Sequence, residues 1–248
     1  MRIVRIYLAQ LFLLSSFCLA QYEEFNFNDG RSLQARIVEA NDKEVVLERV
    51  DGLTFTLDVS LFVPEDQTMI TDWRYQQLVA SGKFIAISGK ANTDNLKKLV
   101  EEGLVQKQWD TYFTLTLTNT SSLPAEDLVL EYQFITTHDS LARLQGREEP
   151  KRADVTSGSL ENIDLAPGET KSFTTQKKQL DATYLEEGWT WPGGGAQPVE
   201  DFTSPLSCKL FFRGEMIAQL QVKPVAPGRE KAKSETPLAT GKEADTNE

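Results

Sequence analysis

Residues 111–118 read Thr-Tyr-Phe-Thr-Leu-Thr-Leu-Thr, in which apolar side chains alternate with threonine. A period of two places successive side chains on opposite faces of a β-strand, and threonine is common on half-exposed strand surfaces. The alternation ends in the turn-forming sequence Asn119-Thr120-Ser121-Ser122-Leu123-Pro124. The stretch therefore predicts a long strand, followed by a loop, in a β-sheet domain.

More strand patterns lie on both sides of this stretch. They are Phe84–Ile87, Leu128–Ile135, Leu160–Leu165, Thr170–Gln176 and a terminal hairpin formed by Leu206–Arg213 and Glu215–Val222. We expect a polar loop over residues 136–158. Leu96, Leu99 and Val100 have helical spacing and predict a minor helix. Six or seven strands over about 140 residues favour an immunoglobulin-like β-sandwich at residues 84–225.

A second β region precedes the sandwich, at residues 21–75. Its short apolar alternations are separated by turn pairs, and Asp51-Gly52 is the strongest hairpin signal in the chain. Pro64, followed by two acidic residues, opens a short helical stretch that carries Met69, Ile70 and Trp73. Five strands and about one turn of helix in roughly fifty residues predict a small SH3-like barrel.

The same region resembles the Sla-type homology domain, which was first described in yeast endocytic adaptors and is widespread in secreted proteins of planctomycete and verrucomicrobial bacteria. The resemblance covers about a fifth of the chain. It is carried by Phe27, Gly30, Leu33, Ala35, Ile37, Val45-Val46-Leu47, Asp51-Gly52, Leu57, Val59, Phe62, Glu65-Asp66, Ile70 and Trp73. It implies an SH3-like fold, and in the yeast adaptors the related domain binds peptides that carry Asn-Pro-Phe-x-Asp. Val63 departs from the family, which often has a Ser or Thr helix cap there.

The ends of the chain differ from these two domains. Residues 1–20 begin with basic residues, continue with the apolar run Ile6–Leu14 and end in Cys18-Leu19-Ala20, which predicts a secretory signal peptide and export to the periplasm or the exterior. A lipid anchor on Cys18 is the alternative, and the bulky Phe17 weighs against it. Residues 76–83 are polar and predict a linker. Residues 226–248 lack apolar periodicity and predict a disordered tail.

Charge and composition exclude several classes of function. The chain has a net charge of −11, which becomes −13 once residues 1–20, with Arg2 and Arg5 and no acid, are removed. Such a surface repels phosphate backbones, so we expect no nucleic-acid partner. A single His and two Cys supply zinc or His-based catalysis poorly. We therefore expect no metal and no cofactor. Cys208 stands among apolar residues, which favours a buried thiol.

Two segments are candidates for chemistry. His138, Asp139 and Ser140 are the residue types of a hydrolase triad, but adjacent residues do not face one another and no Gly-x-Ser-x-Gly is present. We interpret them as solvated loop residues and assign no catalytic residue. Asp29, Asp51, Asp58 and Asp66 do not form a calcium loop.

The other segment is Trp189-Thr190-Trp191-Pro192-Gly193-Gly194-Gly195, flanked by Glu186-Glu187 and Glu200-Asp201. Paired carboxylates with neighbouring indole rings suit sugars, so Trp189 and Trp191 are the candidate ligand-binding residues. In the alternative interpretation, one Trp fills the edge of the sandwich. Trp109 is expected in the core.

These observations predict an exported, non-catalytic protein that binds a protein or an envelope component and does not span a membrane. A carbohydrate-binding or glycan-processing protein that uses residues 189–195 is the alternative. Peptide recognition by the barrel is a third hypothesis.

Overall fold

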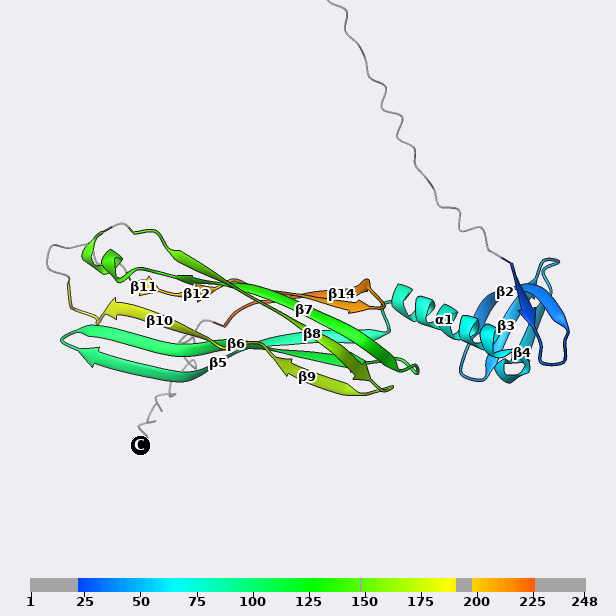
Figure 1. Ribbon diagram of the computed structural model, residues 1–248. Helices are drawn as coiled ribbons and strands as arrows, with labels where there is room; N and C mark the ends of the chain where they lie inside the picture. The colour runs from blue at the N-terminus through cyan, green and yellow to red at the C-terminus, as the bar shows by residue number, and fades with distance from the viewer. Residues whose placement is uncertain (1–21, 148, 191–197, 226–248) are drawn as a thin grey trace, which may run out of the picture. The chain divides into compact units, whose positions relative to one another are not determined.

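The computed structural model describes residues 22–147, 149–190 and 198–225 (Figure 1). The protein is mainly β, as predicted, with three antiparallel sheets and one α-helix among these residues. The chain divides into two compact units, with the boundary between Leu78 and Val79. The expected signal peptide at 1–20 and the expected tail at 226–248 lie outside the described residues. In the described part, no helix is both long and apolar enough to cross a membrane.

The first unit is a four-stranded antiparallel meander. Its strands are β1 (Glu23–Asn26), β2 (Ser32–Ala40), β3 (Glu44–Arg49) and β4 (Thr54–Asp58), with a 3-10 turn η1 at Val59–Leu61. The predicted hairpin at Asp51-Gly52 joins β3 to β4, and Gly52 has the positive φ of +85° that this turn requires. The sequence predicted five strands, but the sheet has four, and the described residues add only an isolated bridge between Phe27 and Phe62.

A small aromatic core holds this unit together. Its fully buried members are Phe25, Ala35, Val45, Leu47, Phe62 and Ile70. Phe62 meets Phe25 edge-on, with ring centroids 5.8 Å apart, and stacks on Phe27 at 4.8 Å. Such ring pairs add about 0.5–1.5 kcal/mol to the free energy gained by burial. All of these core residues except Phe25 are also among the residues that carry the family resemblance.

The helix α1 spans Pro64–Ala80 and is much longer than predicted. It begins at a proline, and the buried Asp66 carboxylate in its first turn accepts a hydrogen bond from the Asn26 amide of β1. The helix therefore occupies most of the expected linker at 76–83. Residues 74–80 read Arg-Tyr-Gln-Gln-Leu-Val-Ala, which lacks Gly and Pro and continues a helix well, and the chain leaves the helix at Gly82 with a φ of +67°.

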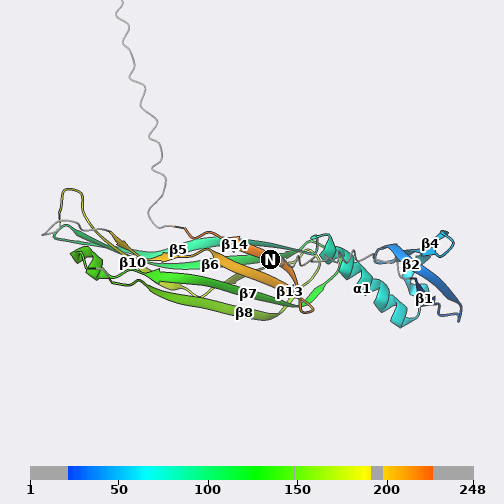
Figure 2. The ribbon, with the colours of Figure 1, turned by 90° about the horizontal axis from the view of Figure 1, so that it is seen from above.

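The second unit is a β-sandwich (Figure 2). The first sheet is built around β6 (Leu104–Asn119), with β5 (Ile85–Glu101), β9 (Thr170–Thr174), β10 (Lys178–Leu185) and β11 (Val199–Glu200). The second is built around β7 (Ala125–His138), with β8 (Arg152–Leu165), β12 (Phe202–Thr203), β13 (Leu206–Phe212) and β14 (Glu215–Val222).

The predicted strand at 111–118 lies in the C-terminal half of β6. Phe113, Leu115 and Leu117 are buried, while the threonines between them are partly exposed and pair with β9. Phe113 meets Phe134 of β7 with ring centroids 5.2 Å apart, which joins the two sheets. Trp109 and Cys208 are buried as expected, and β13 and β14 form the predicted hairpin.

Two sequence predictions for this unit are wrong. Residues 96–100 form no helix, because β5 continues to Glu101 and pairs with β6. A register shift between Asp94 and Lys97, next to Asn95 with a φ of 54°, produces the spacing that imitates a helix. The expected polar loop at 136–158 is also shorter. There β7 runs to His138 and β8 starts at Arg152. The two strands pair with each other although they are rich in polar residues, because the outer face of a sheet can be polar.

Candidate functional site: a groove where the chain crosses between the sheets

One short segment belongs to both sheets of the sandwich. Val199 and Glu200 form β11 and pair with β10, whereas Phe202 and Thr203 form β12 and pair with β7. Asp201 is the single residue between them, so the chain passes from one sheet to the other at this position. The Asp201 amide donates to the Asp181 carbonyl at 2.9 Å, which keeps the crossing point against β10.

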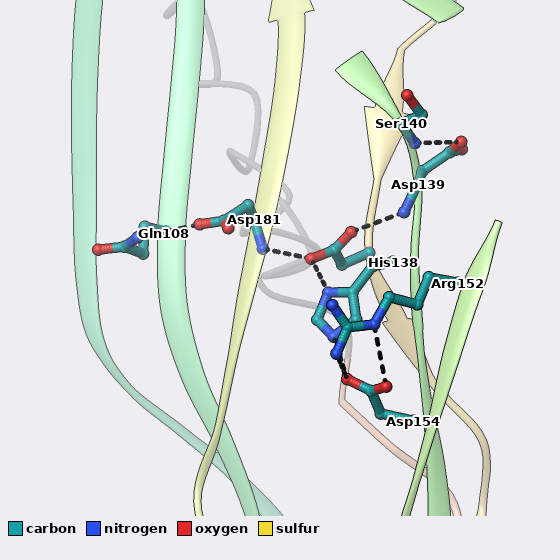
Figure 3. A network of polar contacts seen from close by, with 8 residues as sticks. Gln108, His138, Asp139, Ser140, Arg152, Asp154 and Asp181 are labelled. Carbon is teal, nitrogen blue, oxygen red and sulfur yellow. Dashed lines mark hydrogen bonds and ion pairs between the residues drawn. The ribbon is translucent and has the colours of Figure 1, made fainter. Parts of the chain in front are cut away.

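The buried Asp201 carboxylate contacts His138, Asp139 and Asp181, which are labelled in Figure 3. Its Oδ2 lies 2.8 Å from His138 Nδ1 and accepts from the Asp181 amide at 3.1 Å. Its Oδ1 accepts from the Asp139 amide at 2.9 Å. A buried carboxylate needs such donors, because an unpaired charge away from water is costly. Asp201 therefore fixes the end of β7 to β10.

His138 is the last residue of β7 and is not a loop residue, which corrects the sequence interpretation. Its second nitrogen, Nε2, lies 3.6 Å from Asp154 Oδ2 on β8, so both ring nitrogens face carboxylates. The Ser140 hydroxyl turns elsewhere: it lies 2.5 Å from Glu149 Oε2 and accepts from the Ala142 amide at 3.2 Å. The Ser140 hydroxyl and the His138 ring therefore contact different residues.

Asp139 is a second buried carboxylate beside this network. Its Oδ2 lies 2.7 Å from Arg143 Nη1 and 3.0 Å from Lys151 Nζ, and its Oδ1 accepts from the Ser140 amide at 3.0 Å. Burial alone raises the pKa of this carboxyl, but the hydrogen bonds from Lys151, Arg143 and Ser140 outweigh burial and hold the pKa below its usual value. Asp139 thereby anchors the 3-10 turn η2 (Leu141–Gln145), whose N-cap is Ser140.

These elements enclose a groove of about 700 Å³, which we call the η2 groove. Its lining comes from β5, β6, β10 and β11 of the first sheet, from the end of β7 in the second sheet, and from the turn into η2. The lining residues are Lys97, Lys98, Leu99, Gln106, Lys107, Gln108, His138, Asp139, Leu141, Asp181, Thr183, Val199 and Asp201. Its volume falls in the range of ligand sites. A smaller depression of about 370 Å³ lies over β7, β8 and β13 and includes Ser159 and Lys209.

Trp189, a predicted ligand-binding residue, lies outside this groove lining. A Cβ added to Gly103 in the β5–β6 turn would lie 2.1 Å from Trp189 Cδ2, so the indole is packed against the backbone of this glycine. The side chain is nevertheless 54% exposed and does not fill the sandwich edge. Trp191, the other predicted residue, lies outside the described residues. Glu186 lies at the same turn as Trp189, because the Glu186 backbone amide donates to the Gly103 carbonyl at 2.8 Å.

Sequence reasoning missed the η2 groove. In the sequence, Asp201 stands only beside the Trp-rich segment, and His138 only beside Asp139 and Ser140. The two residues lie 63 positions apart, and no local pattern relates them. Asp29, Asp51 and Asp58 instead bind nearby Arg31, Arg49 and Ser60, and no cluster able to hold a metal occurs among the described residues.

Comparison with known proteins gives little further information. No protein-family model and no curated protein matches the chain. A structural-genomics target called SoR45 is 12% identical over 61% of this chain and 92% of its own, with a TM-score of 0.28. An ApaA protein from Bordetella pertussis is 14% identical over 57% and 95% of the two chains, with a TM-score of 0.24. A β-glucosidase from Listeria innocua is 14% identical over 56% of this chain and 16% of its own, with a TM-score of 0.19. Similarities this low carry no argument about function.

Proposed function

We propose that this chain is an exported, non-catalytic binding protein and that its β-sandwich binds a protein or an envelope component in the η2 groove. The observation that carries the proposal is the groove itself. Its walls come from strands of both sheets, and the Asp201 contacts hold those strands together. A rigid concave surface of this kind suits a binding site. Export rests on the signal-like residues 1–20.

The polar groups beside the groove support binding rather than a reaction. Both His138 nitrogens face carboxylates, and the Ser140 hydroxyl contacts Glu149 and the η2 turn. These groups are engaged in holding strands in place. At the same time, two leucines of the lining keep large exposed fractions, 51% for Leu99 and 59% for Leu141. Exposed apolar side chains next to a groove are typical of interaction sites.

Site-specific crosslinking in the producing cells tests this proposal. A photo-reactive amino acid is placed at Leu99, at Leu141 and, as a control, at Ser159 in the smaller depression on β8. We expect the same partner from both groove positions and none from Ser159. The purified partner should then bind the wild-type protein and lose affinity for Leu99→Arg. Equal crosslinking from Ser159, or unchanged affinity of Leu99→Arg, would contradict the proposal.

For the first unit we make a separate proposal, which is that it binds a peptide. All of its core residues except Phe25 are among those that resemble the Sla-type homology domain, which supports an SH3-like barrel. For the sandwich we propose an immunoglobulin-like fold. Val50, Leu53 and Phe55 expose apolar surface at the β3–β4 hairpin, where a peptide could bind. Titration of Asn-Pro-Phe-x-Asp peptides into the labelled mature protein, followed by NMR, tests this idea. It fails if the amide signals of the hairpin do not shift.

A carbohydrate-binding function is the second candidate, and the exposure of Trp189 favours it. An indole with one side against Gly103 and the other open can stack on a sugar ring. We expect Trp189→Ala to abolish retention on a polysaccharide with little change in melting temperature. A large loss of stability without any binding in the wild type would instead assign the indole to the fold.

A further inference from the structure

Three lysines line the η2 groove. Lys97, Lys98 and Lys107 form no ion pair with any residue that the structure describes, although Lys107 lies over the Tyr184 ring at 5.3 Å. The groove carboxylates, in contrast, are all engaged. Asp201 accepts from His138 and two amides, Asp139 from Arg143 and Lys151, and Asp181 from Gln108 at 3.0 Å. Asp139 is paired with cations, whereas Asp181 accepts from a neutral amide, so the lining carries both signs of charge. Its cations without an acidic partner among the described residues are the three lysines on β5 and β6.

The arrangement of two of these lysines is unfavourable without a ligand. Lys98 and Lys107 are direct partners in the β5–β6 register. Like charges at directly opposite positions destabilise a strand pair. The rest of the protein is strongly acidic, with a net charge of −11, so a cluster of three lysines differs from its surroundings. An anionic group placed at this pair would relieve the repulsion.

The apolar lining narrows the class of ligand. Leu99 lies on β5 and Leu141 on η2, so aliphatic surface is present on both the sheet and the turn that line the groove. No Trp, Tyr or Phe is among the described lining residues, and a sugar would lack the ring on which it usually stacks. A nucleic acid carries a charge on every phosphate but has no aliphatic side chain to place against Leu99 and Leu141. Aliphatic and basic groups together fit a peptide better than they fit a sugar or a nucleic acid.

We infer that the η2 groove recognises a peptide segment that combines acidic and apolar side chains. The acidic side chains pair with Lys97, Lys98 and Lys107, and an apolar side chain lies against Leu99 and Leu141. This inference rests on the proposed binding function and names the chemistry of its partner.

Peptides of about ten residues, which span roughly 33 Å when extended, test the inference by fluorescence anisotropy. The first probe alternates Glu and Leu, the second replaces Glu by Lys, and the third replaces Leu by Ser. Each is titrated into the mature protein, residues 21–248. We expect binding of the Glu/Leu peptide that weakens with added salt, and at least a tenfold weaker affinity for the other two.

Two double variants locate the binding. The double variant Lys97→Gln with Lys98→Gln should bind the Glu/Leu peptide with about tenfold lower affinity. The matched control, Lys209→Gln with Lys223→Gln, removes the same charge from exposed lysines outside the groove and should change the affinity less than twofold. Leu99→Ser should also weaken binding, since it removes apolar contact while the lysines remain.

Three results would overturn the inference. They are no binding of the Glu/Leu peptide at about 1 mM, equal binding of the Lys/Leu peptide, and equal losses in the groove and control double variants. The crosslinking experiment separates these results from failure of the proposed function. A partner that crosslinks at Leu99 and Leu141 and is lost in Leu99→Arg keeps the binding function, even where the acidic peptide chemistry is wrong.

Discussion

The Asp201 carboxylate lies 2.8 Å from His138 Nδ1 and joins the last residue of β7 to the point where the chain changes sheets. The same carboxylate accepts the amides of Asp139 and Asp181. One buried side chain thus determines how two strands meet beside the η2 groove, and the groove depends on it.

Asp201→Ala should destabilise the sandwich by about 3 kcal/mol, because it leaves the imidazole and two amides without their acceptor in a buried place. Urea denaturation followed by circular dichroism measures this change. Glu200→Ala, at the exposed neighbouring position, should cost less than about 0.5 kcal/mol. Similar losses in the two variants would contradict the role assigned to Asp201.

Gly103→Ala should displace Trp189. A Cβ at this position would lie 2.1 Å from the indole, and the φ of +76° adds strain, for a total cost of about 2–3 kcal/mol. Gly168→Ala is the matched control, since it has the same φ of +76° and nothing within 4 Å of the added Cβ. Its cost should be about 1 kcal/mol. The indole N–H signals in a nitrogen–proton NMR spectrum should shift only in Gly103→Ala.

Asp139 should make stability depend on pH in the acid range. Its pKa is lower in the folded protein than the ordinary value of 3.8, despite burial, because of Lys151 and Arg143. Its stabilisation is therefore full above the ordinary pKa and is lost as the pH falls through the lower pKa of the folded state.

Asp139→Asn should be less stable than the wild type by about 1–3 kcal/mol near neutral pH, and the difference should shrink as the pH falls below the ordinary pKa of 3.8. Denaturation curves at several pH values measure it. Glu126→Gln, an exposed acid on β7, should follow the wild-type profile throughout. A constant difference between Asp139→Asn and wild type at all pH values would show that the carboxyl charge is not responsible.

Cys208 should resist thiol reagents in the folded protein. Burial raises the pKa of this thiol to about 11, so only about one molecule in a thousand carries the reactive thiolate at pH 8. In residues 21–248 it is the sole cysteine, which makes the assay specific. We expect little reaction with a disulfide reagent in buffer and complete reaction in denaturant. Rapid labelling of the native protein would mean that β13 opens readily.

The sequence by itself determined the strands and much of the core. The Thr-rich alternation of β6, the turn at Asp51-Gly52 and the terminal hairpin are local patterns, and local patterns report the period of two that defines a strand. Burial of Trp109 and Cys208 follows from their apolar neighbours. Residues 74–80 also favour the full length of α1, because they contain no Gly or Pro, although their polar character predicts a linker.

Only the tertiary structure decided the candidate site. The bulge at Asp94 and Lys97 changes which side chains of β5 oppose those of β6, and that depends on pairing with another strand rather than on residues 96–100. The contact between His138 and Asp201 joins positions 63 residues apart, across a crossing between sheets that no local pattern specifies. A groove formed by both sheets exists only after they pack, because its lining comes from strands that the sequence keeps far apart.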